Sequence, residues 1–193
     1  MELALSICLG IGLSAACGFR VFVPLLGVSA AALAGQVELA EGVAWMGTWP
    51  ALACFLTATI LEIGAYYVPW LDNLLDSIAT PAAVVAGTIV MGSVVTDMSP
   101  LMRWTLALIA GGGTAGLIQT ATVALRGTST ATTGGLGNWM VATFELVASV
   151  SATVLSLLLP LLAAAAVGIA VLGAVYLLAR RRHKANPLRH AAS

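Results

Sequence analysis

Charge is what this chain has least of. Its 193 residues include 8 Lys and Arg and 8 Asp and Glu, so 8% are charged; a soluble domain has about 25%. Hydrophobic residues make up 60%, and the mean hydropathy is +1.03. This composition excludes an ordinary soluble domain and predicts an integral membrane protein with a single membrane domain, residues 1–193.

Histidine and cysteine are also scarce, which narrows the chemistry. The 2 histidines, His183 and His190, lie in the C-terminal tail, so the chain lacks a Ser-His-Asp or Cys-His catalytic set. The 3 cysteines lie in apolar runs without metal-ligand spacing, which is typical of small buried hydrophobic side chains. We therefore expect no catalytic residue, no metal site and no cofactor. Nothing in the chain supports nucleic-acid binding.

One enzymatic alternative rests on Asp72 and Asp76. The two carboxylates are four residues apart, on one face of a helix. Membrane enzymes that act on lipid phosphates through a metal use such pairs, but they need further carboxylates and partner motifs that this chain lacks. The sequence therefore favours a protein that is not an enzyme.

The apolar stretches run about 15 to 20 residues without the alternation of a barrel strand, so we expect an all-α protein of about six transmembrane helices. Apolar segments are expected at 2–17, 18–34, 50–67, 81–95, 101–125, 139–158 and 161–179, with a short surface helix at 71–80. Residues 35–49 form an expected aqueous loop, with Trp45 and Trp49 as interfacial anchors.

Arg20 interrupts the first apolar region. Residues 2–34 are too long for one span, and they offer no polar turn for two spans joined in water. Irregular backbone inside a membrane survives only where protein or a water-filled cavity satisfies its polar groups. We therefore expect a broken helix or a re-entrant segment at Arg20.

A polar stretch at residues 126–138 is expected to form a second break. Arg126 offers a fork of donors for a carboxylate or phosphate, and hydroxyls and glycines are the ingredients of an anion-binding loop. The absence of a Lys after the glycines excludes a P-loop. An ordinary loop before a helix explains the composition as well. The candidate binding residues here are Arg126, Thr128, Ser129, Thr130, Thr133, Gly134, Gly135 and Asn138.

Glycines are frequent in the segment 101–125, at positions 111, 112, 113 and 116. In a membrane such a run predicts close contact between helices, or a break that lines a pathway. Small membrane proteins with Gly-rich helices often associate with themselves, so a homodimer is a possible assembly.

The two halves of the chain share one order: a helix, an Arg-bearing break, a Glu-bearing helix, a proline and a last span. Aligning Gly10 with Gly116 brings Arg20 onto Arg126. We expect repeats at 1–97 and 98–182 and a basic tail at 183–193. Three spans in each half would invert the second repeat and place both termini in the cytoplasm.

Four charges are expected inside the membrane: Arg20, Arg126, Glu62 and Glu145. A lone charge at the centre of a spanning helix costs about 2.5 to 3.5 kcal/mol, so each arginine is expected to pair with one glutamate. The pairs either form a solute site near the midplane or hold helices together. Buried ion pairs are weak sources of stability, which favours the site.

Basic residues crowd the C-terminus, and by the positive-inside rule this end is cytoplasmic. The cluster is explained by a stop-transfer flank, with recognition of anionic lipid head groups as the alternative. It comprises Arg180, Arg181, Arg182, Lys184 and Arg189.

Three motifs together resemble a known family. They are residues 12–24 around Arg20, Glu62 with residues 68–76, and residues 126–138. They are similar to the domain-of-unknown-function family 4126 (DUF4126), small multispan membrane proteins of bacteria, and the similarity covers nearly the whole chain. The resemblance implies a multi-pass protein of the bacterial inner membrane and brings no activity with it.

The sequence thus favours a membrane transporter or channel-like protein for a small anionic or polar solute. Arg20 and Arg126 would bind the anion, Glu62 and Glu145 would hold the arginines or exchange protons, and residues 128–137 would line the path. The alternative is a non-transporting scaffold or assembly factor in which these charges are structural. Expected partners are a small solute or ion, and membrane lipids.

Overall fold

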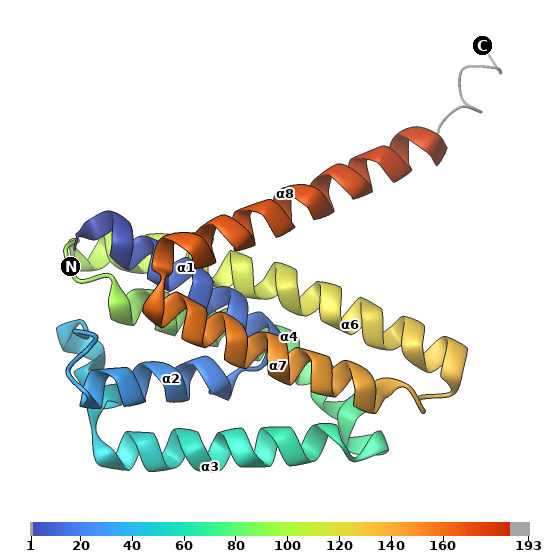
Figure 1. The fold of residues 1–193 in the computed structure, drawn as a ribbon, viewed down its shortest axis with the longest axis horizontal. Helices are drawn as coiled ribbons and strands as arrows, with labels where there is room; N and C mark the ends of the chain where they lie inside the picture. The colour runs from blue at the N-terminus through green and yellow to red at the C-terminus, as the bar shows by residue number, and fades with distance from the viewer. Residues whose placement is uncertain (1, 186–193) are drawn as a thin grey trace.

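The computed structural model describes residues 2–185, in which all regular secondary structure is helical (Figure 1). The description excludes residues 1 and 186–193 and the side chains at 69–70, 72–74, 76, 174–175 and 177–185. The predicted carboxylate pair of Asp72 and Asp76 and the side chains of the basic tail therefore lie outside the described residues.

The chain begins with two helices, α1 (Leu3–Phe19) and α2 (Phe22–Leu33), and a 3₁₀ turn, η1 (Glu41–Gly47). Next come α3 (Trp49–Tyr66) and α4 (Pro69–Val94). A continuous helical rod follows, built from α5 (Pro100–Leu106), the π-helical segment η2 (Ala107–Gly112) and α6 (Gly113–Thr133). The last helices are α7 (Asn138–Leu158) and α8 (Pro160–Ala185).

Several of these helices are long and apolar enough to cross a membrane. They are α3, the part of α4 from Ser77 to Val94, the rod from Pro100 to Thr133, and α7. Shorter apolar helices are α1, α2 and the Pro160–Gly173 part of α8. The predicted all-helical, multi-pass membrane architecture is confirmed.

Helix α1 is the centre of the bundle. It packs against α4, α6, α7 and α8, and its residues are apolar or small on every side, as expected for a helix without a solvent-facing stripe. Hydroxyls tie it to its neighbours: Ser14 Oγ donates to the Gly87 carbonyl at 2.9 Å, and Ser149 Oγ donates to the Ala16 carbonyl at 3.0 Å.

The pair α1 and α2 is a hairpin of two short helices. The helices have 17 and 12 residues, which gives lengths of about 25 and 18 Å, shorter than a hydrocarbon core of about 30 Å. Arg20 is extended, with φ −145° and ψ 128°, and the outer ends of both helices lie at the same end of the bundle (Figure 1). This confirms the break expected at Arg20.

Helix α4 corrects the expectation of a separate surface helix at 71–80. The structure has one helix from Pro69 to Val94 that continues through Pro81. Proline removes one helical hydrogen bond, which favours a break in isolation. Here a row of buried residues from Ala79 to Val94 packs α4 along α1, and this contact favours an uninterrupted helix. The rest of that row is Ala83, Ala86 and Val90.

Arg126 does not lie in a break, which corrects the second sequence-based expectation. Helix α6 continues to Thr133 and ends at Gly134, whose φ of 63° is left-handed. The hydroxyls that predicted a loop bond instead to carbonyls one turn back. Thr128 Oγ1 donates to Ala124 O at 2.9 Å, and Thr132 Oγ1 to Thr128 O at 2.9 Å. Such bonds let hydroxyl-rich segments remain helical.

Helix directions differ from the predicted inverted repeat. The arginine-bearing helices α1 and α6 run in the same direction, and the N-terminus and the end of α8 lie at opposite ends of the bundle (Figure 1). An inverted repeat would make α1 and α6 antiparallel, so the repeat is not confirmed.

Candidate functional site

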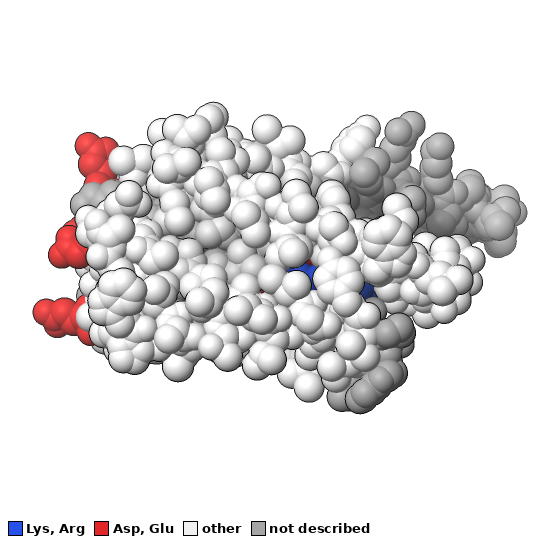
Figure 2. Space-filling model, turned by 60° about the horizontal axis from the view of Figure 1, so that its bottom comes forward, with Lys and Arg blue, Asp and Glu red and all other residues white. Residues whose placement is uncertain are grey.

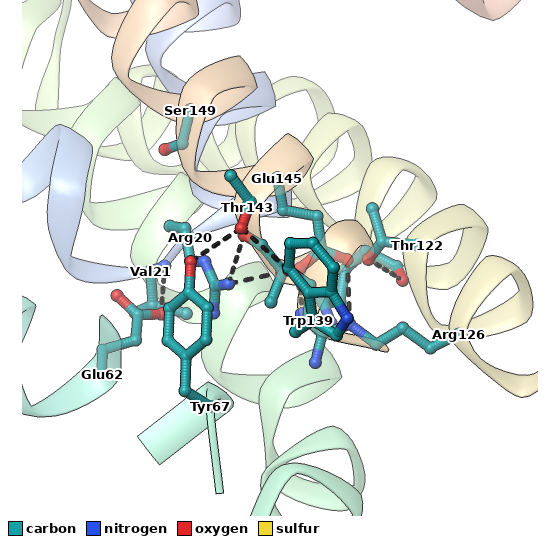
Figure 3. A network of polar contacts seen from close by, with 12 residues as sticks. Arg20, Val21, Glu62, Tyr67, Thr122, Arg126, Trp139, Thr143, Glu145 and Ser149 are labelled. Carbon is teal, nitrogen blue, oxygen red and sulfur yellow. Dashed lines mark hydrogen bonds and ion pairs between the residues drawn. The ribbon is translucent and has the colours of Figure 1, made fainter. Parts of the chain in front are cut away.

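Side chains from α3, α6 and α7 converge on the junction between α1 and α2. The cluster contains Arg20, Glu62, Arg126 and Glu145, the charges that the sequence predicted to lie inside the membrane (Figure 3). The side chains of Arg20, Arg126 and Glu145 are 1%, 4% and 0% exposed. The structure therefore brings together residues separated by more than a hundred positions.

Arg126 and Glu145 form a two-point ion pair between α6 and α7. Arg126 Nε donates to Glu145 Oε1 at 3.0 Å, and Arg126 Nη2 donates to Glu145 Oε2. This fork geometry satisfies both carboxylate oxygens and is the strongest arrangement of an arginine with a carboxylate. The pair therefore holds the two helices in one relative rotation.

Arg20 is less completely paired. Its Nη2 donates to the Ala142 carbonyl at 2.8 Å and lies 3.6 Å from Glu145 Oε2, an ion pair without a hydrogen bond. Its Nε and Nη1 are buried and have no hydrogen-bond partner among the described residues. Those two nitrogens carry three N–H groups, so Arg20 has donors available for an acceptor.

Tyr66 of α3 contacts both arginines. Its ring centroid lies 3.8 Å from Arg20 Cζ and 4.0 Å from Arg126 Cζ. A guanidinium over an aromatic face gains a cation–π attraction that is stronger when the site is desolvated. The ring therefore stabilises two neighbouring positive charges.

Glu62 has a different role from the one predicted. Its Oε1 accepts from the Val21 backbone N–H at 2.8 Å, and its Oε2 accepts from the Phe22 N–H at 3.1 Å. These amides are at the start of α2, where no helical carbonyl is available to accept from them, and both hydrogen bonds are partly buried. Glu62 is a carboxylate cap on a partly buried helix N-terminus, and the helix dipole compensates part of its charge.

The predicted one-to-one pairing of arginines with glutamates is therefore corrected. Glu145 receives both arginines, and Glu62 receives two backbone amides while interacting with the arginines only through longer-range electrostatics. The break at Arg20 explains the difference, because it creates two N–H groups that compete for a carboxylate. The sequence pattern shows the charges but not these amides.

The other predicted binding residues lie in the last turns of α6 and the turn that follows. Thr128 and Thr133 are exposed, and Thr133 Oγ1 donates to the Ser129 carbonyl at 2.7 Å. Asn138 Nδ2 donates to Thr130 Oγ1 at 3.0 Å. Gly134 and Gly135 have φ values of 63° and 89°, which suit the turn into α7. These residues shape a helix–turn–helix connection.

Sequence reasoning missed Tyr66, Tyr67 and Thr143. Tyr66 is four residues after Glu62 on the same helix, and this spacing places both on one face, so the signal was present. Tyr67 OH and Thr143 Oγ1 share a hydrogen bond of 2.8 Å between α3 and α7. That contact joins positions 76 apart in the chain, and no local pattern predicts it.

Replacing Glu62 with glutamine is expected to lower the free energy of unfolding by about 1 kcal/mol, the typical value of a helix cap. Glutamine keeps one acceptor oxygen and loses the negative charge beside the α2 N-terminus. Thermal unfolding in mild detergent measures the effect, with Glu38→Gln in the exposed loop as the matched control. Equal shifts in the two variants would contradict the capping role.

Comparison with known proteins gives one match. No curated protein and no solved structure is similar to this chain. Residues 7–180 match a family described as Domain of unknown function (DUF4126), and this range includes every charged residue of the buried cluster. Because the match covers most of the chain, this protein belongs to the DUF4126 family.

Proposed function

We propose that this protein binds a small anionic or polar solute at the Arg20 and Arg126 cluster and passes it across the membrane. The observation that carries the proposal is the state of Arg20, which is buried and keeps Nε and Nη1 without hydrogen-bond partners among the described residues. Buried donors are normally satisfied, and a buried unsatisfied donor costs about 1 to 3 kcal/mol. A bound carboxylate or phosphate would satisfy them.

The placement of the charges also supports a solute site. Glu145 is shared between Arg20 and Arg126, and Glu62 accepts from two backbone amides of α2. Intramembrane charges that face a bundle interior typically mark substrate or ion pathways.

We further propose that the protein lies in a bacterial inner membrane with the end of α8 in the cytoplasm. Lys and Arg gather in the last turns of α8 and beyond, which supports this orientation by the positive-inside rule. Glu2, Glu38, Glu41 and Asp97 are exposed, and Figure 2 shows acidic atoms gathered at one end of the molecule.

Arg20→Lys is the variant that tests the solute site. Lysine keeps the charge and loses the planar set of donors. A carboxylate or phosphate present at 100 times its dissociation constant should stabilise the wild type by about 2.7 kcal/mol, and Arg20→Lys is expected to lose that stabilisation. Thermal unfolding against a panel of small anions measures binding, and flux of the identified anion into proteoliposomes measures passage.

Arg103→Lys, on α5 at the other end of the rod, is the control and should keep both binding and flux. If an anion stabilised Arg20→Lys as much as Arg103→Lys, its binding site would lie away from Arg20. Absence of any stabilising anion, with Arg20→Lys merely less stable, would refute the solute site.

A second candidate function is a non-transporting scaffold in which the cluster only holds helices together. The two-point pair between Arg126 and Glu145 favours it, because this pair is complete without a ligand. The scaffold predicts that anions bind weakly or not at all and that flux equals that of empty liposomes.

A further inference from the structure

We infer that the ligand of the proposed anion site is an amphiphile with a carboxylate or phosphate head group. This inference rests on the proposed function. The amphiphile would enter laterally from the bilayer, between α3 and α7. The head group would bind Arg20, and the apolar chain would remain among lipids. This assigns a substrate class to the site and a route by which the substrate reaches it.

Helix α3 lies at the edge of the bundle. It packs chiefly against α2 and makes only a small contact with α7. Leu56, Ile60 and Leu61 on its outer face are exposed, as expected for side chains that contact lipid. A helix with so little packing on one side can separate from that neighbour at low cost.

Beside the charge cluster, polar contacts hold α3 in place. Glu62 binds the start of α2, Tyr66 stacks on both arginines, and Tyr67 shares its hydroxyl hydrogen bond with Thr143 of α7. Tyr67 and Thr143 are exposed, so this bond lies at the outer rim. Breaking it would remove a contact between α3 and α7 in the region of the charge cluster, shown in Figure 3.

Aromatic side chains lie at this rim. Tyr67 and Trp139 are both exposed, and Figure 3 shows them in front of the charge cluster. Exposed Trp and Tyr are typical of the level at which lipid head groups meet the hydrocarbon core. An amphiphile would find aromatic and apolar surface for its chain and arginine donors for its head group.

The position of the cluster supports a membrane route. The helices run across Figure 1, and Figure 2 is that view turned about the horizontal axis, so Figure 2 shows a side of the bundle. Basic atoms are visible there between uncharged side chains, away from the acidic groups at one end of the molecule. A side of a membrane bundle faces lipid, whereas the bundle ends face water, so these basic atoms are reached from the bilayer.

Photolabelling in nanodiscs of neutral phosphatidylcholine tests this inference. The probe is a long-chain fatty acid with a diazirine in its chain, and labelled peptides are identified by mass spectrometry. We expect labels on α3 and α7 around Tyr67, Trp139 and Thr143. Dodecyl phosphate should compete at a concentration at least about tenfold lower than inorganic phosphate, because both share a head group but only one has a chain.

Two kinds of variants make the test specific. Arg20→Lys should reduce labelling about tenfold or more, with Arg103→Lys unchanged. Tyr67→Phe and Thr143→Val each remove the rim hydrogen bond without touching the arginines, and we expect labelling to become about two- to tenfold faster. Tyr176→Phe, on an exposed site of α8, is the matched control.

Distinct results overturn the inference. Equal labelling in folded Arg20→Lys would show non-specific partition of the probe. Competition by inorganic phosphate as strong as by dodecyl phosphate would show an anion site reached from water, which refutes the lateral route and leaves the proposed function intact. Failure of every carboxylate and phosphate probe to bind would refute both.

Discussion

Glu145→Gln is expected to lower the free energy of unfolding by about 3 to 5 kcal/mol, the usual cost of removing one partner of a buried ion pair. Glutamine keeps the size of the side chain and removes the charge. Arg126 then loses its two-point partner, and Arg20 loses the ion pair in which its Nη2 lies 3.6 Å from Glu145 Oε2. Both guanidinium groups would remain buried beside Tyr66.

Thermal or denaturant unfolding in mild detergent measures this change. Glu41→Gln, an exposed residue at the other end of the bundle, is the control and should lie within about 0.5 kcal/mol of the wild type. If Glu145→Gln were as stable as the Glu41→Gln control, water or lipid head groups would have to solvate the cluster.

The double variant Arg126→Gln with Glu145→Gln separates pairing from general damage. If the pair is the main contact of both side chains, the double variant should lose less than the sum of the single variants. Complete recovery to wild-type stability would indicate that Arg20 does not need Glu145, and the cluster would then divide into independent parts.

Gly111→Ala is the second large effect, with an expected loss of about 1 to 3 kcal/mol from overpacking. A Cβ at this position would lie 2.6 Å from the Gly87 carbonyl oxygen and 2.8 Å from Met91 Cβ. The first of these is backbone of α4, which cannot move without shifting the helix. The glycines of this segment therefore serve close packing against α4.

Gly113→Ala is the matched control, because nothing lies within 4 Å of a Cβ at that position. It should be neutral or stabilising, since alanine is the better helix former by about 1 kcal/mol. Unfolding of the two variants in the same detergent gives the comparison. Equal stability of the two would show that α4 and the π-helical segment do not pack as closely as their backbones indicate.

The π-helical segment Ala107–Gly112 lies at this contact. Such segments are rare and often occur at functional positions. Here it coincides with the close approach of Gly87 and Gly111, which accounts for its place without any ligand. The alternative interpretation of these glycines, a break that lines a pathway, has no support from the continuous rod.

The sequence by itself determined the class of protein and the residues that matter. Scarce charge and long apolar runs require helices in a membrane, because each backbone N–H must be satisfied within its own segment. The break at Arg20 followed from length alone, since residues 2–34 exceed one span. The cost of buried charge also predicted that Arg20, Arg126, Glu62 and Glu145 would meet.

Only the tertiary structure decided which groups pair. Glu62 reaches Val21 across 41 positions and Arg20 reaches Ala142 across 122, and such partners depend on how whole helices are rotated and placed. The local pattern was also ambiguous at residues 126–133, because hydroxyls suit a loop and, through bonds to carbonyls one turn back, a helix equally well. The tertiary structure shows that these residues continue helix α6 to Thr133.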